Sequence, residues 1–282
     1  MSQNNAKSEK TRQFPDLGTL HHGRLCSMID ACLEAGHHTL KYFRRSDLRI
    51  EAKSDDSPVT IADREAEQLV RDQLGKEYPD DTLQGEEFSE KTGTSTYRWI
   101  VDPIDGTKSF VCGVPLYSCL IALEKEGEPI AGVIYIPATG EMVFAAQGEG
   151  CWYRAGDDQE WKTSRVSDKK RLTDAVFLTS QADLFRTQGA EVAFQELEKQ
   201  SWVSRSWGDG YGYLLVATGR ADVMVDAVCN PWDVAAMVPI LGEAGGCFTD
   251  WKGNITPRGG NGIGTNGNLH QQVVEILSQP MR

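Results

Sequence analysis

The first quarter of the chain alternates apolar and polar residues at helical spacing. Residues 24–45 place apolar side chains on one face and end in basic residues, which suit the negative end of a helix dipole. A short strand over 48–53 and a polar loop over 54–58 are expected next. A second amphipathic helix is expected to begin near Thr60 or Ala62. The apolar faces of the two helices are formed by Leu25, Met28, Ile29, Cys32, Leu33, Leu40 and Phe43, and by Ala62, Ala66, Leu69, Val70 and Leu74.

A period of two replaces the helical spacing in the middle of the chain. Apolar and polar residues alternate there between glycine and proline breaks, which predicts antiparallel strands joined by tight turns. The expected strands cover 116–126, 130–136 and 141–147, with extensions at 151–154 and 161–163. The stretch 165–174 is a plausible junction between two halves of the chain.

The second half predicts strands and helices in alternation, which is typical of layered α/β structure. Pro231 opens an apolar helix over 234–244, and Gly245-Gly246 is the expected stop signal. Strands are expected at 176–179, 202–206, 222–226, 248–250 and 262–265, with further helices at 191–199, 210–218 and 269–277.

One buried strand, an apolar run that begins near Arg98, stops at the segment Asp102-Pro103-Ile104-Asp105-Gly106-Thr107. Two carboxylates three residues apart at a strand end repel each other unless a cation lies between them, and a hard divalent metal is the usual solution. The amides of Gly106 and Thr107 could open a helix whose N-terminal end favours an anion. Metal and anion together suggest phosphate chemistry. The alternative is an ordinary Asp-Gly turn after a strand.

Composition limits the protein class. The 282 residues are 40% hydrophobic, which suffices for one large domain or two tightly joined ones. We expect no transmembrane helix, because no apolar stretch approaches about 18 residues. Residues 1–15 are polar and lack the apolar core of a secretory signal, so we expect a disordered tail there.

Charge and cysteine usage exclude two further classes. The formal charge of −12 without a Lys/Arg cluster argues against a nucleic-acid partner. Seven scattered cysteines without a Cys-x-x-Cys pair argue against a zinc ribbon or a disulfide framework, and the cytoplasm is the simplest location.

Several mechanisms of phosphate chemistry leave signatures that this sequence lacks. No cysteine is followed six positions later by an arginine, and the acidic pair at 102 and 105 is Asp-x-x-Asp rather than the Asp-x-Asp of an aspartyl-phosphate mechanism. No Gly-x-x-x-x-Gly-Lys-[Ser/Thr] loop is present. The five histidines lie outside the acidic segments. A metal site built from carboxylates, with water as the nucleophile, remains.

Four acidic segments occur in a fixed order along the chain. Each has an ordinary local interpretation: Asp63 complements a helix dipole, and Glu86-Glu87 is a solvated acidic edge. Together they resemble the inositol monophosphatase family of magnesium-dependent, lithium-sensitive phosphatases, from about Leu25 to the C-terminus. The segments are Lys53-Ser54-x-x-Ser57-Pro58-Val59-Thr60-x-x-Asp63, Gly85-Glu86-Glu87, Asp102-Pro103-Ile104-Asp105-Gly106-Thr107 and Trp232-Asp233-x-Ala235-Ala236.

This resemblance implies a role for each site residue. Glu86, Asp102 and the Ile104 carbonyl would hold one Mg²⁺, and Asp102 would share a second with Asp105 and Asp233. A third, weaker Mg²⁺ site would lie near Glu86. The catalytic set would be Asp63, Thr107 and Glu86, with the first two polarising the attacking water, while the Gly106 and Thr107 amides would receive the phosphate.

The resemblance also implies a fold and an assembly. We expect a mixed α/β protein, a layered αβαβα sandwich of the inositol monophosphatase and fructose-1,6-bisphosphatase type. An N-terminal α+β subdomain over 16–170 would carry most metal ligands, and an α/β subdomain over 171–282 would carry the substrate contacts and the last ligand. The expected oligomer is a homodimer, and the expected partner a small phosphorylated substrate.

Further details resemble members that hydrolyse histidinol phosphate, a step of histidine biosynthesis. These are Lys108-Ser109-Phe110 after Gly106-Thr107, the segment Arg205-x-Trp207-Gly208-Asp209, and Asp226 seven residues before Asp233. Asp209, Asp226 and Arg205 would contact the substrate, whose ammonium and imidazole suit carboxylates.

Local and functional alternatives remain open at these positions. Asp209 alternatively caps the next helix and Asp226 ends a strand. Gly210 departs from the cysteine that similar enzymes often carry. Inositol 1-phosphate, another small sugar phosphate and 3′-phosphoadenosine 5′-phosphate are the alternative substrates. A catalytically silent scaffold is the non-enzyme alternative, and the intact acidic residues argue against it.

Overall fold

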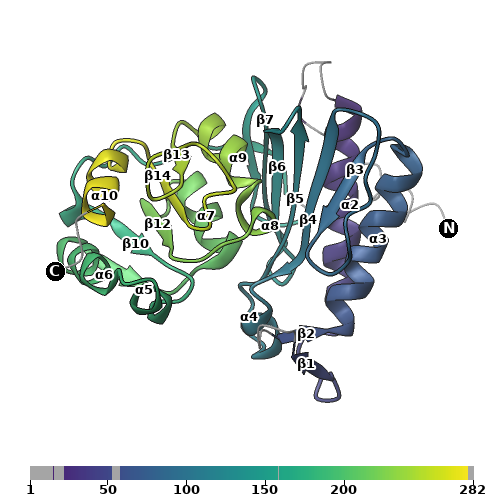
Figure 1. The fold of residues 1–282 in the computed structure, drawn as a ribbon, viewed down its shortest axis with the longest axis horizontal. Coiled ribbons are helices and arrows are strands. Elements are labelled where there is room, and N and C mark those ends of the chain that lie inside the picture. The colour runs from purple at the N-terminus through teal and green to yellow at the C-terminus, as the bar shows by residue number, and fades with distance from the viewer. Residues whose placement is uncertain (1–14, 16–21, 53–57, 158, 279–282) are drawn as a thin grey trace.

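Five layers of helices and sheets alternate across the molecule (Figure 1). The computed structural model describes residues 15, 22–52, 58–157 and 159–278. The αβαβα order that the resemblance implied is therefore confirmed. The expected tail, except for residue 15, and most of the expected loop at 54–58 lie outside the described residues. The division at residue 170 stays a prediction.

The larger sheet has seven strands whose spatial order follows the chain. The first two strands are parallel, and every later neighbour is antiparallel. Tight turns make this order possible: Glu126 and Gly127, both at positive φ (56° and 88°), join two long strands in the way that a two-residue hairpin requires. The strands are β3 (Thr82–Gly85), β4 (Tyr97–Asp105), β5 (Ser118–Lys125), β6 (Glu128–Ile136), β7 (Glu141–Ala146), β8 (Gly150–Arg154) and β9 (Lys162–Thr163).

Both faces of this sheet are covered. Val101 and Ile121 point toward α2 (His22–Thr39) and α3 (Ile61–Glu77) on the outer face. The alternate residues Ile100 and Leu120 point toward the central helices. The central layer contains α7 (Asp209–Ala217), α8 (Pro231–Val234) and α9 (Met237–Ala244).

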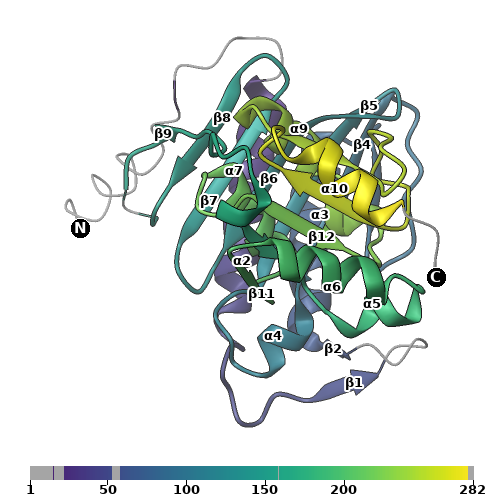
Figure 2. The ribbon, with the colours of Figure 1, turned by 90° about the vertical axis from the view of Figure 1, so that its left-hand side faces the viewer.

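The smaller sheet has five strands in the order β11-β10-β12-β14-β13. Its β10 pairs in parallel with both neighbours, and the remaining pairs are antiparallel. The strands are β10 (Val176–Leu178), β11 (Val203–Arg205), β12 (Val223–Asp226), β13 (Cys247–Thr249) and β14 (Gly262–Thr265). Figure 2 shows the outer helices in front of this sheet, namely α5 (Asp183–Thr187), α6 (Glu191–Gln200) and α10 (His270–Leu277), and a short 3₁₀ turn, η1 (Leu172–Asp174), precedes β10.

Three elements differ from the sequence expectation for identifiable reasons. The first helix ends at Thr39 rather than near residue 45, and the apolar spacing beyond it reflects packing of Phe43 against Phe110 and Tyr117. The expected helix at 234–244 is split into α8 and α9, because Pro239 cannot donate to the carbonyl four residues earlier. The expected strand end at Asp102 is also wrong, since β4 continues to Asp105.

Short elements account for most of what the pattern missed. β3 and α5 were not expected, and each is only four or five residues long. A two-stranded hairpin, β1 (Ile50–Ala52) with β2 (Pro58–Thr60), leads into α3, and α4 (Thr107–Val111) follows β4. In Figure 1 the hairpin and α4 lie together at one end of the molecule.

The junction between α8 and α9 lies directly on the larger sheet. A Cβ atom at Gly132 of β6 would lie 2.5 Å from the Ala236 carbonyl oxygen and 2.9 Å from the Ala236 Cβ. Small residues on both sides therefore allow this close approach, which gives the Ala235-Ala236 pair of the sequence motif a packing function.

We expect Gly132→Ala to lower the free energy of unfolding by about 1–3 kcal/mol, because the added methyl forces the helix junction off the sheet. Urea denaturation measures this change. Gly242→Ala is the matched control: a Cβ at Gly242 of α9 meets no atom within 4 Å, so this variant should be as stable as the wild type or up to about 1 kcal/mol more stable. Equal stability of the two variants would contradict the packing function.

Candidate active site

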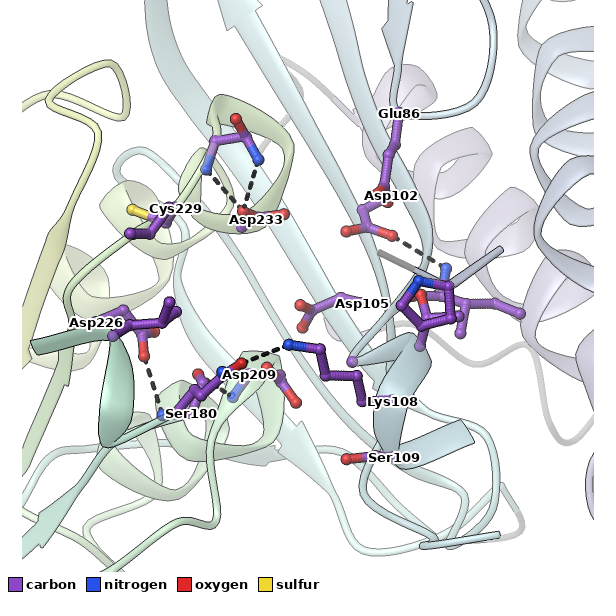
Figure 3. Close-up of a pocket in the computed structure, with 18 of the residues that line it drawn as sticks. Glu86, Asp102, Asp105, Lys108, Ser109, Ser180, Asp209, Asp226, Cys229 and Asp233 are labelled. Carbon is purple, nitrogen blue, oxygen red and sulfur yellow. Dashed lines mark hydrogen bonds between the residues drawn. The ribbon is translucent and has the colours of Figure 1, made fainter. Parts of the chain in front are cut away.

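A pocket of about 280 Å³ opens where the carboxyl end of β4 meets the central helices. Figure 3 shows two groups of residues facing each other across it. One side consists of Glu86 on the turn after β3, Asp102 and Asp105 on β4, and Lys108 on α4. The other side consists of residues from the second half of the chain: Ser180, Asp209, Asp226, Cys229 and Asp233.

Three carboxylates form the tightest group in this pocket. One oxygen each of Asp102, Asp105 and Asp233 lies within 4.8 Å of the others. Glu86, on the turn after β3, lines the same pocket, as does Ile104. The structure therefore brings together all five residues predicted to hold metal.

An irregularity in β4 places Asp102 and Asp105 on one face. Residues three apart in a regular strand point to opposite sides. Here Asp102 pairs with Leu120 and Asp105 with Ser118, so three steps along β4 correspond to two along β5. This bulge also contains Pro103, whose missing N–H costs nothing where the ladder is interrupted.

Asp105 is held from both halves of the chain. The Ser118 hydroxyl donates to its Oδ2 at 2.6 Å, and the Gly210 amide at the start of α7 donates to the same oxygen. A Cβ at Gly210 would lie 2.3 Å from the Ser118 Oγ and 2.9 Å from the Asp105 Oδ2. Glycine at position 210 is therefore what this arrangement of Ser118 and Asp105 requires.

Asp233 is fixed by the start of α8. The helix begins with Pro231 at its first position, and the Asn230 amide donates to the Asp233 Oδ2 at 2.6 Å in a capping box. In the same way, the Ile104 amide donates to the Asp102 Oδ1 at 3.1 Å. Backbone amides close in sequence thus orient two of the three clustered carboxylates.

Asp63 caps α3, and the same carboxylate lies within reach of Thr107. Its Oδ2 accepts the Thr60 amide at 2.8 Å and the Thr60 hydroxyl at 2.6 Å, which caps α3. The Thr107 hydroxyl lies 3.4 Å from the Asp63 Oδ1 and 3.1 Å from the Ile104 carbonyl oxygen, so the one hydroxyl proton can be donated to either acceptor. Thr107 opens α4 next to Gly106, whose φ of 81° is the left-handed conformation that favours glycine.

The carboxylates raise one another's proton affinity. Burial first, and then the neighbouring acids, raise the pKa of Asp102 and Asp105 well above the usual range, and burial raises the pKa of Asp233 to about 7. Of the described residues that line the pocket, Lys108 alone is cationic, and its Nζ donates to Gln181. The donor set consists of carboxylate and carbonyl oxygens that lack a compensating charge, so it fits a hard divalent cation such as Mg²⁺.

Two further carboxylates, Asp209 and Asp226, line the pocket on the same side as Asp233. Asp226 ends β12 and accepts the Ser180 amide and the Tyr213 hydroxyl, each at 3.0 Å, and burial raises its pKa to about 6. The Asp209 carboxylate lies against Gly106, where a Cβ would be 2.6 Å from the Asp209 Oδ2.

The capping alternative for Asp209 is wrong. Gly208 is the N-cap of α7, and no side chain caps the helix. Asp209 itself has a φ of 54°, and its amide donates to the Ser180 hydroxyl at 2.7 Å. Asp226, by contrast, both ends a strand and lines the pocket.

Arg205 is the predicted contact residue that the structure places elsewhere. It ends the edge strand β11, is exposed, and donates to the carbonyl of Ser204, while the pocket lining does not include it. Ser118, Ser180 and Tyr213 were not predicted as site residues, although they hold Asp105, Asp209 and Asp226. Their partners lie 13 to 46 residues away, so no local pattern identifies them.

Comparison with known proteins agrees with this geometry. The family model described as inositol monophosphatase family matches residues 25–282. The chain belongs to the inositol monophosphatase family. The family and the predicted enzyme class, a phosphoric monoester hydrolase, are thus confirmed.

Relatives of the inositol monophosphatase family match most of the chain. A histidinol-phosphatase of Chlorobaculum parvum is 43% identical over 83% of this chain and 88% of its own length. An inositol-1-monophosphatase of Rhizobium meliloti is 31% identical over 90% of this chain and 96% of its own length. The solved structure of the extragenic suppressor protein suhB of Bartonella henselae superposes with a TM-score of 0.83, at 29% identity, over 91% of this chain and 99% of that one.

Two other expectations from the sequence can be compared with the structure. All seven cysteines are free thiols. Within the described part of the chain, no helix has the length and apolar character needed to cross a membrane.

We expect Asp233→Asn to abolish turnover without lowering the free energy of unfolding of the metal-free protein. The amide oxygen still accepts from Asn230, and one repelling charge is removed. Phosphate release and urea denaturation in chelator measure the two quantities.

Asp222→Asn is the control for Asp233→Asn. Asp222 is buried outside the pocket and pairs with Lys169 at 3.1 Å, so this variant should lose stability while each folded molecule keeps its turnover. Full turnover in Asp233→Asn would refute a metal-binding role for this residue.

Proposed function

We propose that the protein is a magnesium-dependent phosphomonoesterase that hydrolyses L-histidinol phosphate to L-histidinol and phosphate. The observation that carries the substrate assignment is a pair of further carboxylates, Asp209 and Asp226, which line the same pocket as the clustered acids and are not among the proposed metal ligands. A phosphate ester that also carries cationic groups suits a pocket with these additional acids.

Five groups would hold two Mg²⁺ ions: the carboxylates of Glu86, Asp102, Asp105 and Asp233 and the carbonyl of Ile104. When bound, the ions would lower the pKa of a coordinated water and neutralise charge on the phosphoryl oxygens. A third, weaker ion near Glu86 is part of the same proposal.

The protein's own groups would then position the water and the phosphate. With its hydroxyl turned toward Asp63 rather than toward the Ile104 carbonyl, Thr107 would keep its oxygen lone pairs to accept a proton of the attacking water. The Gly106 and Thr107 amides would bind phosphate oxygens. The water oxygen forms a bond to phosphorus while the ester P–O bond breaks, and the leaving oxygen takes up a proton to become the alcohol of histidinol.

The substrate's amino group and imidazole would contact Asp226 and Asp209. Asp226 is buried, and the groups that donate to it, the amide and hydroxyl of Ser180 and the Tyr213 hydroxyl, are neutral, so a cation would offset its desolvation. The higher identity to the histidinol-phosphatase, 43% against 31% for the inositol-1-monophosphatase, supports the same choice.

Inositol 1-phosphate is the second candidate, because carboxylates also accept hydrogen bonds from ring hydroxyls, as Asp226 does from Tyr213. Another small sugar phosphate and 3′-phosphoadenosine 5′-phosphate remain alternatives. Homodimer formation, lithium sensitivity and a cytoplasmic location are further predictions from the family resemblance.

Magnesium-dependent phosphate release from histidinol phosphate, inositol 1-phosphate and 3′-phosphoadenosine 5′-phosphate tests the assignment. We expect kcat/KM for histidinol phosphate to exceed the others by at least about tenfold, which corresponds to about 1.4 kcal/mol of discrimination. A tenfold preference for inositol 1-phosphate would reject histidinol phosphate but leave the phosphatase chemistry intact.

Asp226→Asn should lower kcat/KM for histidinol phosphate by about tenfold or more at pH 7.5, because a charge-assisted contact is lost. Inositol 1-phosphate should be affected less. The pKa of Asp226 is raised to about 6, so its charged form disappears as the pH falls through that value. The ratio of wild-type to variant kcat/KM should therefore approach one below pH 6.

Taking the ratio cancels the titration of the substrate, which both proteins share. Tyr213→Phe is the matched control, since it removes a hydrogen bond to Asp226 but keeps the charge. A ratio for Asp226→Asn that does not change with pH would contradict an ionic contact at Asp226.

A further inference from the structure

A buried ion pair lies directly behind the turn that carries Glu86. Glu67 belongs to α3, and its side chain is fully buried. The Arg71 Nε, one helical turn further along, donates to the Glu67 Oε1 at 2.7 Å. Neither residue lines the pocket.

The remaining contacts of this pair are with the backbone of the turn after Glu86. The Glu87 amide donates to the Glu67 Oε2 at 2.7 Å, and the Phe88 amide donates to the Oε1 at 3.3 Å. Arg71 completes the arrangement, because its second guanidinium nitrogen donates to the Phe88 carbonyl at 3.0 Å. The two residues that follow Glu86 are therefore held to α3 by three hydrogen bonds.

The residue before Glu86 is fixed as well. Gly85 pairs with Val101 in the parallel ladder, so it lies beside the residue that precedes Asp102. A Cβ at Gly85 would be 2.0 Å from the Glu67 Oε1 and 2.6 Å from the Oε2. The Glu67 carboxylate thus occupies the space that a side chain at position 85 would need. The backbone is therefore fixed on both sides of Glu86.

A stabilising role alone does not account for this arrangement. A buried ion pair contributes little net stability compared with apolar residues of the same volume, since both charges must leave water. The hydrogen bonds go instead to one turn, and that turn carries one pocket residue. Ligands of a metal are commonly oriented by a second set of hydrogen bonds behind them.

We propose that Glu67 and Arg71 are positioning residues that orient the Glu86 carboxylate for Mg²⁺. This inference rests on the proposed function, because it assumes that Glu86 is a metal ligand. In this proposal, Glu67 and Arg71 of α3 touch neither the ion nor the substrate but determine part of the Mg²⁺ affinity.

The test compares Glu67→Gln with Glu124→Gln. Glu124 is also a fully buried glutamate with an arginine partner, Arg258 at 2.7 Å, but it lies six residues beyond Ser118 on β5, at the strand end away from the pocket. Both variants remove the charge of a buried glutamate that pairs with an arginine, so both are expected to unfold at lower urea concentration. Only Glu67→Gln should weaken Mg²⁺ binding to the metal-free protein in calorimetry, by about tenfold or more.

Two readouts separate positioning from general loss of stability. In Glu67→Gln the amides of Glu87 and Phe88 should exchange hydrogen faster under native conditions, and a higher Mg²⁺ concentration should restore kcat without changing KM. Arg71→Lys keeps the charge but loses the forked guanidinium, which donates to both Glu67 and the Phe88 carbonyl. It provides a milder variant if Glu67→Gln does not fold. Its Mg²⁺ affinity should fall by less than that of Glu67→Gln.

Wild-type Mg²⁺ affinity in a folded Glu67→Gln or Arg71→Lys protein, or an equal loss in Glu124→Gln, would overturn the proposal. Failure of the proposed function is a separate outcome, because it would appear in the wild type as no Mg²⁺ binding or no phosphate release.

Discussion

Repulsion among carboxylates is the constraint on which the pocket depends. Asp102, Asp105 and Asp233 lie within one small volume, where burial and neighbouring acids raise the cost of charging each of them. Among the described residues that line the pocket, the structure does not relieve this cost with a cationic side chain, since the one such residue, Lys108, hydrogen bonds to Gln181. It supplies partial charges instead. Each of the three acids accepts a backbone amide, from Ile104, Gly210 and Asn230 respectively. Such dipoles orient a carboxylate without neutralising it, which leaves the site prepared for a cation.

Close approach of the layers brings the acids together and makes the Gly210 amide available to Asp105. Gly132 brings the junction of α8 and α9 onto the larger sheet, and Gly210 brings the start of α7 against Asp105. Gly85 of β3 likewise allows α3 to approach the sheet, because the Glu67 carboxylate occupies the space of a side chain at position 85. Each contact tolerates no Cβ atom, so the positions of the helices relative to the sheet, and with them the positions of the acids, are set by residues that have no side chain.

Most of the fold could be predicted from the sequence, because the chain changes its hydrophobic period where it changes from helix to strand. The acidic segments were identified from four short sequence motifs that occur in a fixed order. Two features of the site could not be. The bulge that turns Asp105 to the same face as Asp102 depends on pairing with β5, which also brings the Ser118 hydroxyl to Asp105. The Ser180 hydroxyl reaches the Asp209 amide only after the second half of the chain folds. Arg205 shows the opposite failure: its motif suggested a contact, but the edge strand places it outside the pocket.

The hydrogen bond from Gly210 to Asp105 joins residues 105 positions apart. Bringing such distant segments together costs loop-closure entropy that local contacts do not repay, so pairings of this kind form late in folding. During synthesis, β4 leaves the ribosome long before α7 and α8 exist. Its two aspartates must then remain hydrated and without their distant partners while the larger sheet forms. The order of synthesis therefore separates formation of the sheet from completion of the site, and the ion is expected to be acquired only by a nearly finished chain.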